Sequence, residues 1–308
     1  MSKKPAKKTA AKKAKKAAAA SELIQPKQMG DELLADITST RNDEGKNFRI
    51  WWLGQSGYLV QFQGSHLLFD PYLSDSLTRK YAETDKPHVR MTELAIDPAR
   101  LDFIDIVTSS HNHTDHLDGE TLGPLLEANP AISLVAPEAN RAFVADRLGI
   151  DPSRPCGLVN GQSIEHGPFK LTAVPAAHEA LDTDDEDRHL YLGYVAEFGD
   201  WTVYHSGDTM LFDGMVETLN SWAIDLAILP INGRAPERRV AGNLTGFEAA
   251  CLAKDIGARF VTPCHYEMFE FNTASPAPFA ADCARLGQDF RVLECGEKLS
   301  SAELLARA

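Results

Sequence analysis

The sequence predicts an α/β protein in which two β-sheets pack together with helices on the outside. Two observations support this class. Residues 48–53, 58–62 and 66–69 read as a meander of short apolar strands, and Gln63-Gly64-Ser65 forms the turn between the last two. After residue 100, short apolar strands alternate with helical segments. Strand meanders combined with βα units are typical of layered sheets covered by helices.

The remaining elements follow the same patterns along the chain. A short polar helix is expected over 31–37, and Thr245 with Glu248 forms a capping box that opens a helix running to about Asp255. Further strands are expected at 104–108, 132–135, 169–174, 191–198, 201–204, 226–231, 260–261 and 290–293, and further helices at 122–126, 141–148 and 278–286.

Charge is distributed unevenly along the 308 residues. Eight of the 31 basic residues lie in 1–20, which leaves 23 against 44 acidic residues, a net charge of −21 for the rest of the chain. A body this acidic would repel a phosphate backbone, which argues against a general nucleic-acid binder. No apolar run approaches the roughly 18 residues that span a bilayer, so no membrane span is expected.

The start of the chain has no apolar segment of the kind that secretory signals carry. The five cysteines are scattered and form no CxxC pair, as expected for reduced thiols in the cytoplasm. Three regions are predicted: a disordered Lys/Ala-rich basic tail at 1–20, a helix and linker at 21–46, and one folded domain at 47–308. An alternative for the tail is a basic arm that touches nucleic acid or an acidic surface.

One segment concentrates the chemistry. A predicted strand runs into a loop that holds His111, His113, Asp115 and His116 within six residues. Several imidazoles and a carboxylate at such close spacing need many hydrogen bonds and would repel one another if the rings were charged. A divalent cation resolves both problems, because neutral imidazole and carboxylate are among its preferred ligands. The sequence therefore predicts a metal site.

This H-x-H-x-D-H string resembles that of the metallo-β-lactamase-fold hydrolase superfamily. The superfamily has four further elements, each after a strand, and the chain supplies all of them in order: Asp70 in LFDP, His178 in VPAAH, Asp208 in YHSGD and His265 in VTPCH. The match covers roughly residues 48–295. It implies the four-layer αββα sandwich, with the site on loops at one edge of the two sheets.

The resemblance implies a binuclear metal site. By position, His111, His113 and His178 would bind the first cation, Asp115, His116 and His265 the second, and Asp208 both. The resemblance further implies a metal-bridged hydroxide as nucleophile, with Asp115 as the catalytic residue that orients it and takes its proton. Asp70 would support the ligand loop without binding metal. His205 would either hold a ligand in place or be an ordinary buried histidine.

The donor types admit more than one metal. Imidazole and carboxylate accept zinc, which is the first expectation, and also manganese or Fe(II). The flavodiiron-type oxidoreductases of the superfamily carry Glu where this chain has His113, so hydrolysis is favoured over redox chemistry.

Several stretches look similar to the L-ascorbate-6-phosphate lactonase group: 51–54, 104–105, 204–208 and the stretch that ends at His265. That likeness implies opening of a lactone, in that group with manganese. The predicted function is a metal-dependent hydrolase of a small-molecule lactone or ester, a sugar-phosphate lactone among them.

The loop 232–239 contains three arginines, whose forked guanidinium groups suit phosphate or carboxylate. Arg234 or Arg238 is a candidate to bind an anionic group of the substrate, and an exposed basic loop is the alternative. Asn232, at the start of this loop, and Tyr266, beside His265, are further candidate substrate-binding residues.

Two other functions remain open at this point. One is a phosphodiesterase or RNase of the same fold, which only the basic tail favours. The other is a metal-binding member without turnover, against which the complete ligand set counts. A homo-oligomer is compatible with the sequence.

Overall fold

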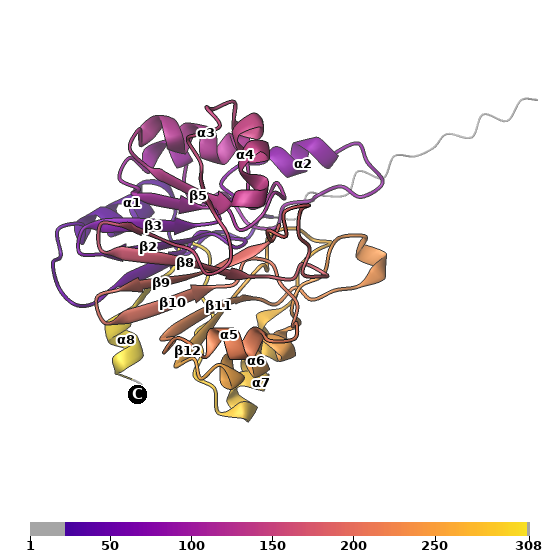
Figure 1. The fold of residues 1–308 in the computed structure, drawn as a ribbon. Helices are drawn as coiled ribbons and strands as arrows, with labels where there is room; N and C mark the ends of the chain where they lie inside the picture. Colours follow the sequence, from indigo (N-terminus) through magenta and orange to yellow (C-terminus); the bar gives the residue numbers. More distant parts are fainter. Residues whose placement is uncertain (1–21, 307–308) are drawn as a thin grey trace, which may run out of the picture.

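The computed structural model describes residues 22–306, and the predicted basic tail lies outside them. Two β-sheets stack face to face, and helices cover both outer faces (Figure 1). This arrangement is the predicted αββα sandwich. Within 22–306, no helix has both the length and the apolar character that crossing a membrane requires.

The first sheet has seven strands and the second has six. The order in the first is β13 (Lys298–Ser300), β1 (Arg49–Trp52), β2 (Tyr58–Phe62), β3 (Ser65–Phe69), β4 (Ile106–Thr108), β5 (Ser133–Pro137) and β6 (Cys156–Leu158). The order in the second is β12 (Phe260–Cys264), β11 (Leu226–Pro230), β10 (Trp201–His205), β9 (Leu192–Phe198), β8 (Phe169–Pro175) and β7 (Ser163–His166). The meander β1–β3 is antiparallel, whereas β3–β6 are parallel to one another.

The helices are α1 (Gly30–Ser39), α2 (Ser76–Tyr81), α3 (Gly119–Ala128), α4 (Arg141–Leu148), α5 (Met215–Leu219), α6 (Gly246–Asp255), α7 (Pro276–Leu286) and α8 (Ser301–Leu305). In Figure 1, α3 and α4 lie on the side of the first sheet and α5, α6 and α7 on the side of the second. The Thr245–Glu248 capping box is confirmed at the start of α6.

Aromatic side chains fill the space between the sheets. The ring of Phe198 lies 5.2 Å from that of Phe62 and 5.5 Å from that of Phe48. The hydroxyl of Tyr58 on β2 donates a 2.8 Å hydrogen bond to the carbonyl of Pro263 on β12, so one buried polar contact also joins the sheets. This packing fixes how the loops at the sheet edge lie relative to one another.

The segment before the first strand is part of the folded body. Leu33 and Ile37 of α1 are fully buried, and the indole of Trp51 donates a 2.8 Å hydrogen bond to Asp36. The helix of the predicted helix-and-linker segment is therefore packed against the first sheet, whereas residues 44–47 are exposed.

The strand predicted at 290–293 is wrong. Only Phe290 pairs, through a single bridge to Val261, and the chain then leaves the sheet as a loop. Its apolar residues are explained by packing, since Leu293 is buried in the core. The strand that completes the first sheet is β13, which the sequence analysis did not predict, as it did not predict β6, β7, α2, α5 and α8.

Candidate metal centre

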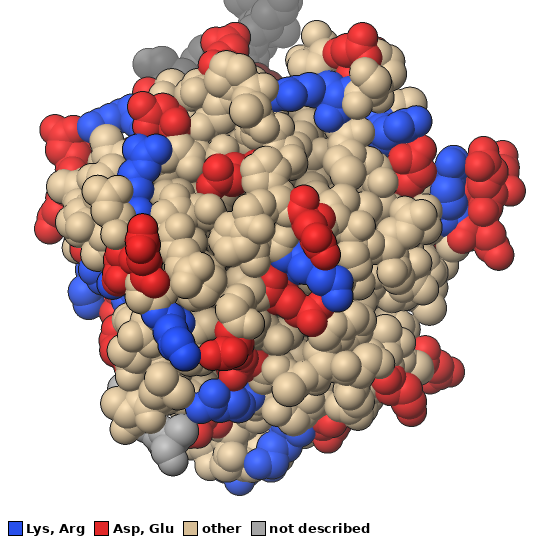
Figure 2. Space-filling view, turned by 60° about the vertical axis from the view of Figure 1, so that its left-hand side comes forward, with Lys and Arg blue, Asp and Glu red and all other residues tan. Residues whose placement is uncertain are grey.

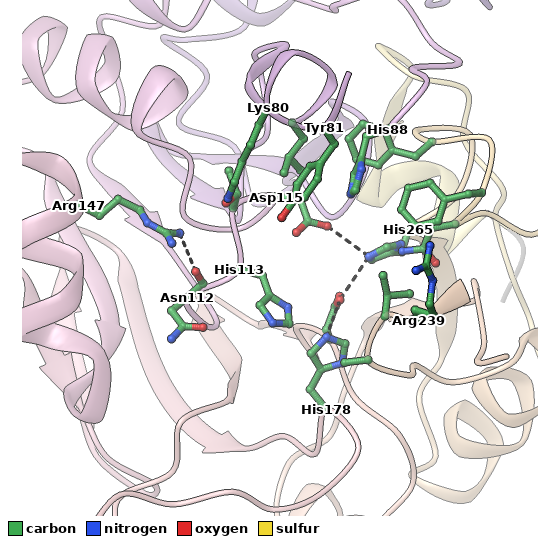
Figure 3. Close-up of a pocket in the computed structure, with 18 of the residues that line it drawn as sticks. Lys80, Tyr81, His88, Asn112, His113, Asp115, Arg147, His178, Arg239 and His265 are labelled. Carbon is green, nitrogen blue, oxygen red and sulfur yellow. Dashed lines mark hydrogen bonds and ion pairs between the residues drawn. The ribbon is translucent and has the colours of Figure 1, made fainter. Parts of the chain in front are cut away.

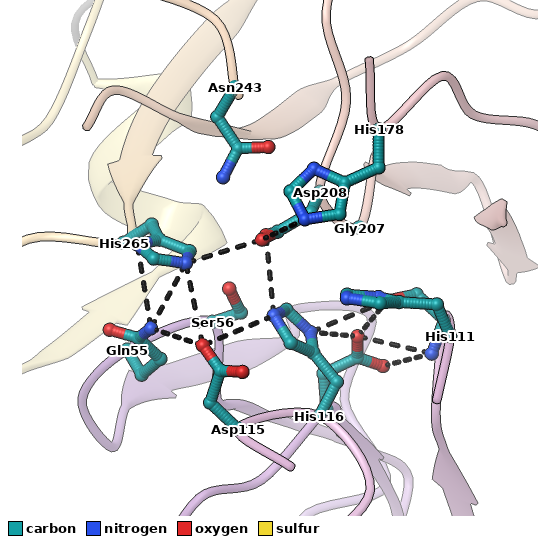
Figure 4. Close-up of polar contacts among 12 residues, drawn as sticks. Gln55, Ser56, His111, Asp115, His116, His178, Gly207, Asp208, Asn243 and His265 are labelled. Carbon is teal, nitrogen blue, oxygen red and sulfur yellow. Dashed lines mark hydrogen bonds and ion pairs between the residues drawn. The ribbon is translucent and has the colours of Figure 1, made fainter. Parts of the chain in front are cut away.

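The candidate ligands lie on loops that follow four strands. The loop after β4 carries the 111–116 cluster, and the ends of β8, β10 and β12 are followed by His178, Asp208 and His265. β10, β11 and β12 are parallel, so their carboxyl ends meet at one edge of the second sheet. Figure 4 shows the resulting convergence of side chains from both sheets.

The structure brings all seven predicted ligands together. They form three groups whose ligand atoms lie within 4.8 Å of one another: His111–His113–His178, His111–His116–Asp208 and Asp115–His116–His265. The groups share His111 and His116, so they make one continuous cluster.

Asp208 lies between the two ends of this cluster. One carboxylate oxygen is 3.3 Å from Nε2 of His116, and the other is 3.2 Å from Nε2 of His265 and 3.7 Å from Nε2 of His178. The carboxylate thus faces rings from both predicted cation positions, as its predicted bridging role requires.

Hydrogen bonds to Nδ1 fix the orientations of two of the imidazole rings. Nδ1 of His116 donates a 2.8 Å hydrogen bond to Asp70, and Nδ1 of His178 donates one of the same length to the carbonyl of Gly242. Each contact leaves Nε2 directed into the cluster. Such contacts fix the tautomer and make an imidazole a better ligand.

Three buried polar atoms of the cluster have no hydrogen-bond partner among residues 22–306, although two of them face each other as an ion pair. They are Nε2 of His111, Nε2 of His116 and Oδ1 of Asp208. Leaving polar atoms buried and unpaired is costly, and such atoms need an explanation such as an ion. A pair of imidazole nitrogens and a carboxylate oxygen is a donor set that divalent cations bind. The residues present therefore fit a metal.

Burial and neighbouring charge shift the pKa values within the cluster. Burial, with His116 and His113 nearby, holds the pKa of His111 well below its usual value, so this ring is neutral at pH 7. Burial also opposes charge on His265, but Asp208 and Asp115 outweigh it and raise the pKa of His265 to about 9. Without a cation, the carboxylates thus hold protons on part of the cluster, and metal binding would release them.

Asp70 and His205 occupy supporting positions. Asp70 is fully buried and accepts hydrogen bonds from Thr108, Ser110 and His116. His205 donates from Nε2 to the carbonyl of Ser56 at 2.9 Å, and its Nδ1 accepts from the backbone of Gly207 at 3.2 Å. His205 therefore holds the turn that precedes Asp208.

The four candidate substrate-binding residues make contacts of their own, and Arg238 donates to the carbonyl of Asn232. Arg234 makes two 2.7 Å hydrogen bonds to Glu248, so its guanidinium is already paired. Tyr266 is buried, donates to the carbonyl of Leu293 and stacks on Trp52. Asn232 is also buried and bonds to other asparagine side chains. None of the four lines the pocket above the cluster, so the geometry of this pocket does not support a substrate-binding role for them.

Gln55 is a site residue that the sequence analysis missed. Its Nε2 donates a 2.7 Å hydrogen bond to Oδ2 of Asp115 and lies 3.0 Å from Nε2 of His265 (Figure 4). The signal available was the Gly-Gln-Ser-Gly turn between two buried strands. Tyr191 was missed as well. Its ring lies 5.4 Å from that of His111 and 5.5 Å from that of His178.

A pocket of about 470 Å³ opens above the cluster (Figure 3). Its floor contains His113, Asp115, His178, Asp208 and His265. Its sides come from α2, α4 and the segments 239–241 and 269–272. Arg147 of α4 donates to the carbonyl of Asn112 at 2.6 Å and so ties the ligand loop to that helix.

Comparison with known families agrees with this geometry. The profile of the Beta-lactamase superfamily domain matches residues 66–266, about two thirds of the chain. The chain belongs to this superfamily. The match contains the whole candidate metal centre, and the resemblance seen in the motifs is confirmed at the level of the superfamily.

Individual relatives match most of this chain. A UPF0173 metal-dependent hydrolase of Rubrobacter xylanophilus is 29% identical, over 82% of this chain and 96% of its own length. Two solved structures share the fold. A metallo hydrolase of Ignicoccus hospitalis has 21% identity and a TM-score of 0.61, covering 82% of this chain and 98% of its own. The isothiocyanate hydrolase from Delia radicum gut bacteria has 17% identity and a TM-score of 0.64, with the same coverage.

Proposed function

We propose that this chain is a metal-dependent hydrolase that cleaves a small-molecule ester, with lactones as the preferred esters. The observation that carries the proposal is the convergence of seven imidazole and carboxylate ligands, five of which form the floor of an open pocket. Relatives named as metal-dependent hydrolases support it. We further propose two cations, with zinc first and manganese or Fe(II) as alternatives.

Divalent cations held by these ligands would make water acidic enough to ionise near neutral pH. The protein's own contribution is positioning and proton transfer. Gln55 holds Oδ2 of Asp115, and Oδ1 has no hydrogen-bond or ion-pair partner among residues 22–306. Asp115 faces the pocket and is partly accessible, so Oδ1 can accept the proton of the attacking water.

A small substrate fits better than a polymer. A pocket of about 470 Å³ lies within the size range of small-molecule sites. Outside residues 1–20 the chain carries a net charge of −21, which would repel a long polyanion. On the face shown in Figure 2, Lys and Arg side chains are interspersed with Asp and Glu. The pocket size and the net charge favour a lactone or ester over RNA.

The test combines metal analysis with a substrate panel. Purified full-length protein should contain close to two divalent ions, and chelation should abolish hydrolysis of lactones and aryl esters until metal is restored. Asp115→Asn should lower kcat by about 10²–10⁴-fold, the range of general base catalysis. The control Asp255→Asn, at the exposed end of α6, should leave kcat unchanged. Turnover of RNA alone, or full activity after exhaustive chelation, contradicts the proposal.

A further inference from the structure

Four aromatic side chains form one side of the pocket. This aromatic wall consists of Tyr81, His88, Phe269 and Phe271, and each of them lines the cavity. Tyr81 stacks on His88 with 4.2 Å between ring centroids and 19° between planes. Phe271 meets His88 edge-on at 4.5 Å, and Phe269 does so at 5.2 Å. Because each ring is held by its neighbours, the wall is a preformed surface.

The rings of the wall are available for contact with a ligand. Tyr81 and Phe271 are partly exposed, although both pack against a small core of their own beside the pocket. Aromatic faces and edges attract flat apolar groups through stacked and edge-on contacts. Burial disfavours the protonated form of His88 and lowers its pKa, so this member of the wall is neutral at pH 7. The wall therefore suits a flat apolar group.

Cationic groups lie at the edge of the same wall. Arg239 lines the pocket, and its only ion pair among residues 22–306 is a 2.9 Å contact with Asp85. The side chains of this pair are 57% and 78% exposed, and such surface pairs contribute little to stability. A ligand anion could therefore replace Asp85 at small cost.

Two lysines add to this positive charge. The ammonium of Lys86, adjacent to Asp85, lies 5.0 Å from the ring centroid of Phe271 and has no hydrogen-bond partner among residues 22–306. The ammonium of Lys80, a pocket residue, lies 5.2 Å from the ring centroid of Tyr81. Across residues 22–306, neither lysine forms an ion pair.

We propose that this pocket selects small organic anions that carry a flat apolar group. The apolar group lies against the aromatic wall, and a carboxylate or phosphate takes the place of Asp85 at Arg239. The inference rests on the proposed hydrolase function and deepens it, because it assigns the substrate class. It also moves anion recognition from Arg234, which Glu248 holds, to Arg239 in the same loop.

Hydrolysis of matched esters tests the class. The probes are 4-acetoxybenzoate, which has both a ring and an anion, phenyl acetate, which has only the ring, and 3-acetoxypropanoate, which has only the anion. For the metal-loaded full-length protein, KM should be lowest for 4-acetoxybenzoate. Arg239→Gln should raise that KM at least about tenfold, since charge-assisted hydrogen bonds are the strong ones, and leave the KM for phenyl acetate unchanged. Phe271→Ala should raise KM for both aryl esters and spare 3-acetoxypropanoate.

Arg285→Gln is the matched control. Arg285 is equally exposed and pairs with Asp282 at 2.9 Å, but it lies on α7. The variant Arg285→Gln should leave the KM of every probe ester unchanged. Equal KM values for charged and neutral aryl esters, or an equal effect of Arg239→Gln on both, would overturn the proposal.

A binding measurement separates this inference from the proposed function. Saturation-transfer NMR should detect benzoate and phenyl phosphate bound to the full-length protein, and Arg239→Gln should weaken both at least about tenfold. Whichever binds more tightly identifies the anion. If no ester is hydrolysed but this Arg239-dependent binding persists, the hydrolase proposal fails and the ligand class stands. If neither anion binds in an Arg239-dependent way, the ligand class fails even if esters are hydrolysed.

Discussion

The side-chain amide of Gln55 donates a 2.7 Å hydrogen bond to the carboxylate of Asp115, although sixty residues separate them. Gln55 is fully buried, and its backbone carbonyl also accepts a hydrogen bond from the backbone N–H of His265. One turn of the first sheet thus contacts ligands that follow β4 and β12. Gln55 is a positioning residue in this arrangement.

Replacing Gln55 with Leu should lower kcat by about 10–100-fold, because the charged carboxylate of Asp115 loses a hydrogen bond of about 1.5–3 kcal/mol. KM should change little, because Gln55 does not line the pocket, and a lower thermal midpoint without loss of kcat would indicate a structural role alone. Steady-state kinetics and thermal unfolding check this. Gln63→Leu is the control. The backbone φ of Gln63 is 47°, close to the 50° of Gln55, but Gln63 lies in an exposed turn. Full activity of the Gln55 variant would refute the positioning role.

Asp70 should determine metal affinity without binding metal. Asp70→Asn removes the carboxylate that holds Nδ1 of His116, and losses of this kind weaken metal binding by about 10–100-fold. Competition with a chromophoric chelator measures the change. Asp105→Asn provides the comparison, because that carboxylate accepts from the backbone of His66. If both variants bind metal as tightly as the unaltered protein, Asp70 has no such role.

Gly207→Ala should destabilise the turn that carries Asp208. Gly207 has a φ of +60°, and an added Cβ would lie 2.6 Å from Cβ of Ser110 and 2.9 Å from the carbonyl of Leu192. Neither neighbour can move freely, so we expect the free energy of unfolding to fall by about 2 kcal/mol or more, with weaker metal binding. Gly149→Ala has a similar φ of +64° and open space around it, so it should cost about 1 kcal/mol and spare the metal. Chemical denaturation of both variants gives the comparison, and equal losses would show that crowding is unimportant.

Arg234→Ala should affect stability and leave KM unchanged. The hydrogen bonds from Arg234, with those from Thr245, lower the pKa of Glu248 from 4.5 to about 2. A carboxylate with a depressed pKa stabilises the folded state fully above its unfolded pKa and loses that effect as pH falls through the folded pKa.

The stability difference between Arg234→Ala and the unaltered protein should therefore be present at pH 7 and shrink between about pH 4.5 and 2. Because the pair is partly exposed, we expect no more than about 1 kcal/mol at pH 7. Urea unfolding across this pH range provides the measurement. A change in KM for an anionic substrate would instead restore Arg234 as a binding residue.

Some elements could be predicted because their signals are local. The Thr245–Glu248 capping box lies within four residues, and the buried strands β2 and β3 contain the apolar runs 58–60 and 67–69. The strand expected at 290–293 failed because an apolar run also describes a loop packed on the core. Short elements such as β13 depend on pairing with a distant strand, here β1, and have little signal of their own.

The sequence by itself determined the superfamily and the residues proposed as metal ligands, because residue type and spacing after each strand are local properties of the chain. Only the tertiary structure decided that Gln55 contacts Asp115, that Glu248 holds Arg234, and that Arg239 lines the pocket beside the aromatic wall. Each of those contacts joins residues from different segments of the chain, and each arginine pairs with whichever carboxylate the fold brings near it. Their outcome depends on how the two sheets pack and on which charges that packing brings within hydrogen-bonding distance.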